Sequence, residues 1–145
     1  MIRAAASLVL LALLAGCSDQ QTILDRLNSQ DEQTRERAIW TVASRGPEAR
    51  WAVPTLIESL ADPETRVVVA WALAEIGPDA AEAGEALLTL LQDEVPQVRA
   101  SAAWALARIG RRDETTRQAI EALRDDSDVL ARQTAEAALR YLSAS

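Results

Sequence analysis

Hydrophobic positions after residue 21 recur with the period of an amphipathic helix. In residues 98–110, "VRASAAWALARIG", a projection at 100° per residue gathers Val98, Ala102, Leu106 and Ile109 into one apolar stripe. Shorter clusters of leucine and isoleucine lie between such segments, at Leu56, Ile57, Leu60, Leu87, Leu88, Leu91, Ile120 and Leu123. The pattern predicts pairs of helices, one short and one longer, each burying one face.

The longer helices are copies of one unit. Trp40, Trp71 and Trp104 follow one another at intervals of 31 and 33 residues, each with an arginine five residues before it and a glycine six residues after it. Arg132 continues the series, with Ala137 at the tryptophan position. Such self-similarity is typical of a solenoid of stacked units. The predicted units cover residues 22–53, 54–84, 85–117 and 118–145.

The ends of the second helix in each unit carry local signals. Asp62, Pro63 and Glu64 are typical of an N-cap, a first-turn proline and an acid at the positive helix end. Gly77, followed by Pro78, is a C-terminal stop. These signals predict a helix of about 14 residues in the second unit.

Two segments, residues 98–110 and "GPEARWAVPTLIESLAD" (46–62), resemble HEAT repeats of the short kind also found in bilin-lyase-like proteins. The resemblance extends over nearly everything after Gln21 and is best in units two and three; Arg45, where isoleucine is usual, weakens unit one. It implies an all-α fold, a right-handed α-α superhelix of about four helical hairpins, with the second helices on the concave side. It implies no chemistry by itself.

The first residues have the layout of a secretory signal peptide. Arg3 precedes an apolar run over residues 4–14, well short of the about 20 residues that cross a bilayer as a helix. Residues 14–17, Leu-Ala-Gly-Cys, resemble the lipobox of bacterial lipoproteins, which implies cleavage after Gly16 and lipidation of Cys17. We therefore expect residues 1–16 to be removed, 17–21 to form a lipidated tether and 22–145 to form the repeat domain.

The same resemblance predicts where the protein resides. A lipidated Cys17 implies a body anchored to a membrane of the bacterial cell envelope and facing the periplasm. In lipoproteins generally, an aspartate directly after the cysteine retains the protein at the inner membrane. Here Ser18 follows Cys17 and Asp19 comes one residue later, so we expect the outer membrane rather than the inner one.

Composition narrows the classes of function. The chain has 22 acidic and 15 basic residues, all of the latter arginine, and a net charge of −7, which argues against nucleic acid as a partner. It has no histidine and one cysteine, which removes most metal sites and the histidine-activated nucleophiles. We therefore expect no catalytic residue, no cofactor and no metal.

The tryptophans lie opposite the apolar stripe in the helical projection. We expect Trp40, Trp71 and Trp104 to form a row on the concave surface, about 10 Å apart if adjacent units stack like packed helices. Such a row fits a protein- or peptide-binding surface, but the same rings could instead cover the seams between repeats, while Trp51 lies in a turn and is predicted to cap the first helix pair. The candidate binding residues are Trp40, Trp71, Trp104, Arg37, Glu75, Arg108 and Tyr141.

A second series pairs arginine with nearby aspartate. The members are Arg35, Arg66, Arg99 and Arg132, with Asp31, Asp62, Asp93 and Asp128. We expect a structural arginine–aspartate ladder between repeats rather than an anion site. Arg111 and Arg112, close to Arg108, are expected to be solvated charges after a helix end.

The sequence thus predicts a membrane-anchored scaffold that binds a protein or an extended peptide. One alternative is an enzyme or enzyme accessory related to HEAT-type bilin lyases and hydroxylases. This alternative is disfavoured because the hydroxylase-type metal site uses histidine–glutamate pairs, and the chain has no histidine. Another is an envelope structural or glycan-binding module, in which tryptophan rings stack on sugars.

Overall fold

A computed structural model describes residues 18–144 of the chain. The predicted signal peptide and Cys17 lie outside the described residues. The described part consists of helices joined by short turns and contains no strand. Between residues 18 and 144, no helix combines the length and the hydropathy needed to cross a membrane.

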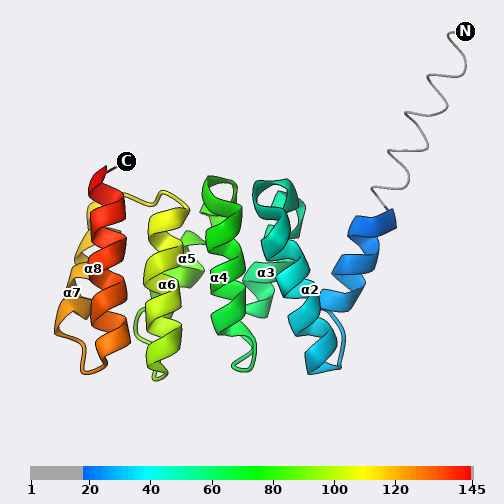
Figure 1. Cartoon of the computed structure of the whole chain (residues 1–145), viewed down its shortest axis with the longest axis horizontal. Helices are drawn as coiled ribbons and strands as arrows, with labels where there is room; N and C mark the ends of the chain where they lie inside the picture. The colour runs from blue at the N-terminus through cyan, green and yellow to red at the C-terminus, as the bar shows by residue number, and fades with distance from the viewer. Residues whose placement is uncertain (1–17, 145) are drawn as a thin grey trace, which may run out of the picture.

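Helices of two kinds alternate along the chain and form two layers. The first helices are residues 18–27, α3 (Val53–Ser59), α5 (Gly84–Leu90) and α7 (Glu114–Ala122). The second helices are α2 (Glu32–Arg45), α4 (Arg66–Ile76), α6 (Pro96–Arg108) and α8 (Val129–Ala144). The second helices stand side by side in front, with α3 and α5 behind them, and residue 18 and the C-terminus lie at opposite ends (Figure 1). The predicted all-α solenoid of helical hairpins is confirmed.

Glycine ends two of the second helices. Gly46 (φ 55°) follows α2 and Gly77 (φ 74°) follows α4, both in the left-handed region that side chains with a Cβ rarely adopt. Short 3-10 segments, η1 (Gly46–Ala52) and η2 (Gly77–Ala83), then lead into α3 and α5. A third such segment, η3 (Leu123–Asp125), follows α7.

The start of α4 differs from the prediction. The Asp62 carboxylate accepts a hydrogen bond from the Glu64 N–H at 3.0 Å, as an N-cap would. However, residues 63–65 form a turn in which Thr65 has φ −113° and ψ −10°, so the regular helix begins at Arg66 and has 11 residues. The predicted start of this helix was wrong, because the capping signal at Asp62 is followed by a turn before the regular helix begins.

Alanine makes close packing of the second helices possible. Ala70, Ala72 and Ala74 of α4 are completely buried, as are alanines of α6. The predicted stripe on α6 is buried too, but so are Ala100 and Ala107, which the projection placed on the tryptophan side. Because α4 and α8 both pack against α6, its buried surface is wider than one stripe.

Ion pairs join each second helix to the following unit. Arg35 lies 3.1 Å from Asp62, and Arg66 lies 2.5 Å from Asp93. Arg99 makes the strongest of these pairs, because its Nε and Nη2 each donate to one carboxylate oxygen of Asp126 at 2.7 Å. The Asp126 carboxylate is consequently held at a lowered pKa, chiefly by the Arg99 hydrogen bonds.

Asp31 and Asp128 of the predicted series are not rungs of the ladder, and Arg99 pairs with Asp126, which the prediction did not include. Asp128 instead accepts from the Leu130 N–H at 2.9 Å, and Asp31 accepts from the Thr34 N–H at 2.8 Å, so both cap helices. Arg132 forms no such pair among the described residues, and its Nη1 donates to the carbonyl of Asp126 at 2.7 Å. The ladder therefore has three rungs between units.

Arg111 is not a solvated charge, contrary to the prediction. Its guanidinium donates to Glu85 at 2.5 Å and to Asp113 at 2.9 Å, and so connects the third and fourth first helices. Asp113 caps α7 by accepting from the Thr116 N–H. That bond, with those from Arg111 and the Thr116 hydroxyl, lowers the pKa of Asp113 to about 2.

Candidate functional site

The outward surface of α2, α4, α6 and α8, here called the second-helix face, carries most of the predicted binding residues. Trp40 of α2 and Trp71 of α4 are among its most exposed apolar side chains, at 46% and 39%. Their ring centroids are 5.1 Å apart with an interplanar angle of 55°, so the two indoles touch. We call these two residues the tryptophan pair.

A carboxylate accompanies the tryptophan pair. The Trp40 Nε1–H points to the Glu36 carboxylate one helical turn earlier, at 3.4 Å. This contact orients the indole and places a negative charge beside an exposed aromatic surface. A cation is attracted both by the carboxylate and by an indole face.

Trp104 has a different environment. It is half-buried, packs against the core and meets the Tyr141 ring edge-on, with centroids 5.6 Å apart. Arg108 completes this group: its guanidinium lies 5.6 Å from the Tyr141 ring centroid, and its Nη1 donates to the Tyr141 hydroxyl at 3.3 Å. The evenly spaced row of three tryptophans was therefore wrong, because two indoles touch and the third packs on α8.

A hollow of about 380 Å³ lies near the C-terminal ends of α2 and α4. Glu75, Arg108 and Tyr141, all predicted binding residues, line it together with the backbone around Gly46 and Gly77. Arg108 also donates from Nε to the Ala74 carbonyl at 3.3 Å. These contacts hold the Arg108 guanidinium against α4 and Tyr141, which gives it a packing role.

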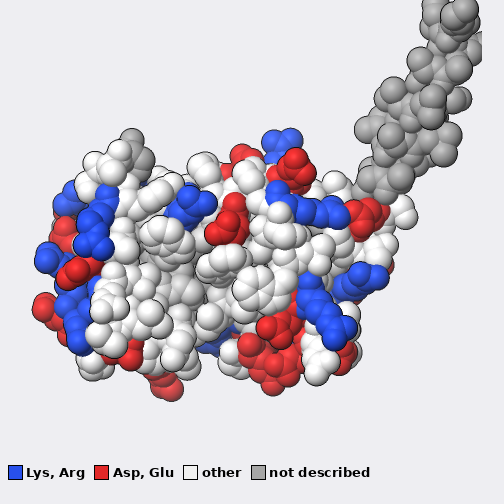
Figure 2. Space-filling view, viewed as in Figure 1, with Lys and Arg blue, Asp and Glu red and all other residues white. Residues whose placement is uncertain are grey.

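The other two residues singled out from the sequence lie outside these groups. Arg37 is exposed on α2, close to the tryptophan pair in sequence. Trp51 is half-buried in η1 and packs against the core, next to the first helices. Figure 2 shows an uncharged surface crossing the middle of the second-helix face, with acidic and basic groups side by side near α2.

Comparison with protein families assigns this architecture. A model described as HEAT repeats matches residues 53–140, which is more than half of the 145-residue chain. The chain belongs to the HEAT-repeat family. A comparison with curated proteins finds no match.

Three of the solved structures with similar folds are designed or engineered proteins. One is the designed armadillo repeat protein YIII(Dq.V1)4CPAF in complex with peptide (KR)4, with 24% identity and a TM-score of 0.67, covering 83% of this chain and 62% of that one. Another is the designed armadillo repeat protein YIII(Dq)4CqI, with 22% identity and a TM-score of 0.64, covering 83% of this chain and 63% of that one. An engineered protein is 24% identical with a TM-score of 0.67, covering 90% of this chain and 64% of that one. At these identities the likeness shows the fold alone. The HEAT-repeat chain spans less than two thirds of the length of each.

The family and its architecture are typical of non-enzymatic scaffolds compatible with protein binding. Within residues 18–144, no group of three or more histidine, cysteine, aspartate or glutamate side chains is placed to hold a metal ion. The second-helix face instead presents two exposed indole rings, one of them beside a carboxylate.

Two residues that matter in the structure were missed in the sequence. Glu36 is not among the predicted binding residues, although a spacing of four residues on a helix places its side chain beside Trp40. Asp126 is not among the predicted ladder residues, although the spacing of 27 residues in Arg35–Asp62 and Arg66–Asp93 selects it as the partner of Arg99. Both signals were present in the sequence.

Proposed function

We propose that this HEAT-repeat protein is a lipid-anchored scaffold of the bacterial cell envelope whose second-helix face binds an extended basic segment of a partner protein. The tryptophan pair carries the proposal. The two indoles touch each other, but each remains more than a third exposed to solvent. Packing within the domain therefore does not account for two large apolar rings at this place. Tryptophan is the side chain most enriched at binding hot spots.

The charge next to the tryptophan pair favours a cationic partner. Glu36 contacts Trp40, and Glu75 lies one helical turn after Trp71. A lysine or arginine side chain over an indole face gains a cation–π interaction and, here, a nearby carboxylate. The designed armadillo repeat protein YIII(Dq.V1)4CPAF, which has a similar fold, is bound to a (KR)4 peptide, and that supports a basic ligand for this face.

Because the two indoles touch, the tryptophan pair offers one contact point rather than a row. It fits one or two side chains of the partner, and the remaining affinity comes from the uncharged surface of α4 and α6 beside it. This geometry favours a short extended segment over a long repetitive ligand.

The test is binding of a (KR)4 peptide to the full chain, measured by fluorescence anisotropy. We expect the double variant Trp40→Ala/Trp71→Ala to weaken binding at least about tenfold. The matched control is Val129→Ala/Leu130→Ala, which removes two other exposed apolar side chains at the far end of the solenoid. Unchanged affinity in the tryptophan variant, or a preference for peptidoglycan fragments over the peptide, would refute a basic peptide as the ligand.

The anchor is a separate part of the proposal and rests on residues 14–17. Metabolic labelling with palmitate should mark the wild-type protein, and Cys17→Ala should abolish the label and release the protein from the membrane fraction. Separation of the two membranes then distinguishes the outer from the inner membrane. A Cys17→Ala protein that stays in the membrane fraction would contradict lipid anchoring.

A further inference from the structure

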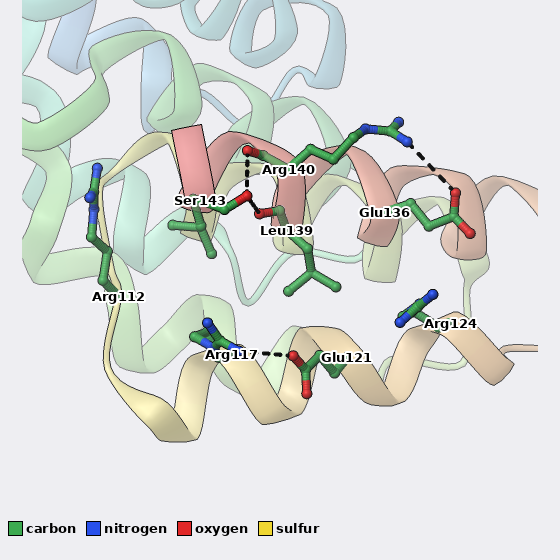
Figure 3. Close-up of a pocket in the computed structure, with 9 residues that line it drawn as sticks. Arg112, Arg117, Glu121, Arg124, Glu136, Leu139, Arg140 and Ser143 are labelled. Atoms are coloured by element: carbon green, nitrogen blue, oxygen red, sulfur yellow. Dashed lines mark hydrogen bonds and ion pairs between the residues drawn. The ribbon is translucent and has the colours of Figure 1, made fainter. Parts of the chain in front are cut away.

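The outer face of the last hairpin contains a groove of about 560 Å³ between α7 and α8. Four arginines line it, Arg112, Arg117, Arg124 and Arg140, together with Glu121, Glu136 and the half-buried Leu139 and Leu142. We call it the arginine groove. Figure 3 shows Arg117 on α7, Arg124 on η3 just after it, and Leu139 pointing from α8 into the space between the helices.

The lining of the arginine groove has four arginines and two glutamates. Arg117 lies 3.2 Å from Glu121 and 3.9 Å from Glu114, and Arg140 lies 3.9 Å from Glu136. Arg112 and Arg124 have neither a hydrogen bond nor an ion pair through their side chains within residues 18–144. The lining thus has two more positive than negative side chains, in a chain whose net charge is −7.

A capping role alone does not explain this excess. The last unit of a solenoid needs a polar outer face for solubility. Balanced charges would meet that need, whereas guanidinium groups gathered in a groove attract anions to it. The planar guanidinium also matches the two oxygens of a carboxylate.

From these observations we infer that the arginine groove binds an acidic peptide segment of a partner protein, with Arg112 and Arg124 pairing with its carboxylates. Leu139 and Leu142 add an apolar surface that fits a leucine-sized side chain between the acidic residues. The groove lies at the opposite end of the solenoid from residue 18, which leads to the proposed tether, so a protein segment fits better than a lipid headgroup (Figure 1).

The test uses the full chain and a labelled peptide of alternating glutamate and leucine. We expect Arg112→Gln/Arg124→Gln to weaken binding about tenfold, and added salt to weaken wild-type binding. Both arginines lack partners among the described residues, so these substitutions break no ion pair there, and circular dichroism should be unchanged. The matched control is Arg26→Gln/Arg50→Gln, which makes the same change in charge on exposed residues of the first unit.

Three results would overturn this inference. The first is equal binding of a peptide in which glutamine replaces glutamate. The second is an equal loss of affinity in the Arg26→Gln/Arg50→Gln control, which would indicate non-specific attraction. The third is loss of binding to phosphatidylglycerol vesicles, but not to the peptide, in Arg112→Gln/Arg124→Gln. The Trp40→Ala/Trp71→Ala variant should bind the acidic peptide normally, so this site and the tryptophan pair are tested separately.

Discussion

The first two units and the last two units use equivalent positions differently. In the first half, Trp40 and Trp71 are exposed and contact each other, and the Arg35–Asp62 pair is partly open to solvent. In the second half, Trp104 is half-buried against Tyr141, and the Arg99–Asp126 pair is bidentate. Sequence equivalence in a repeat therefore does not give equivalent exposure.

The neighbouring unit causes this difference. The fourth unit has Ala137 where the others have tryptophan, which leaves room for Tyr141, one helical turn later, to cover Trp104. The second unit has Glu75, which is not aromatic, at the position equivalent to Tyr141. The second half thus forms a packed base, and the first half presents the exposed tryptophan pair, which is the proposed binding surface.

The largest expected contrast is between two rungs of the ladder. Arg99→Ala leaves the Asp126 carboxylate, whose side chain is 8% exposed, without its partner, so we expect a loss of about 3 kcal/mol in the free energy of unfolding. Arg35→Ala affects a pair whose aspartate is 28% exposed and should cost about 1 kcal/mol. Urea unfolding followed by circular dichroism measures both, and equal losses would show that the two halves do not differ in this way.

The tryptophans should show the next largest contrast. Trp104→Ala removes a half-buried ring that packs against the core, and we expect it to destabilise the fold by about 2 kcal/mol. Trp40→Ala removes a largely exposed ring and should cost less than about 1 kcal/mol. Should Trp40→Ala prove the more damaging of the two in thermal unfolding, the tryptophan pair would be structural rather than a binding surface.

Acid should weaken the protein through its aspartates. Asp113 has its pKa lowered to about 2 by bonds from Thr116 and Arg111, and the Arg99 hydrogen bonds lower the pKa of Asp126. Because these folded-state pKa values lie below the unfolded value of about 3.9, the stabilisation is complete above that pH and is lost as the pH falls toward about 2. Urea midpoints measured between pH 6 and pH 2 should fall in the wild type.

A variant locates this acid sensitivity in the packed half. Asp126→Asn should lower stability at pH 6 and flatten the dependence on pH. Asp125→Asn makes the same change in charge on the adjacent residue, which has no ion pair to Arg99. An equal pH profile in the two variants would exclude the Arg99–Asp126 pair as a source of the effect.

The smallest expected effect concerns the carboxylate beside the tryptophan pair. Glu36→Gln should weaken binding of the (KR)4 peptide about threefold, with little change in stability, because a charge at the edge of an interface contributes modestly. Glu32→Gln, earlier on α2, is the control. The difference between the two should disappear at high salt, and its persistence there would argue against an electrostatic role for Glu36.

Much of the architecture was predictable because it depends on short-range periodicity. The apolar stripe that includes Leu106 and Ile109 predicts the helices, and the recurrence of arginine, tryptophan and glycine predicts the hairpin repeat. Gly46 and Gly77 end their helices as predicted, because few other residues adopt a positive φ there.

The site was less predictable because it depends on contacts between units. A helical projection places Trp71 and Trp104 on the same side of their helices, but it contains no information about which ring the adjacent unit covers. Tyr141 covers Trp104 from a position that is not aromatic in the other units. The choice of Asp126 over Asp128 likewise depends on the stacking of two hairpins, although the 27-residue spacing reveals it.

The most direct test of the central claim, that the tryptophan pair is the binding surface, is an NMR titration that follows the four indole N–H resonances. We predict that a (KR)4 peptide shifts the signals of Trp40 and Trp71 and leaves those of Trp51 and Trp104 unchanged. Shifts confined to Trp51 or Trp104, or no shift in any indole at saturating peptide, would contradict the claim.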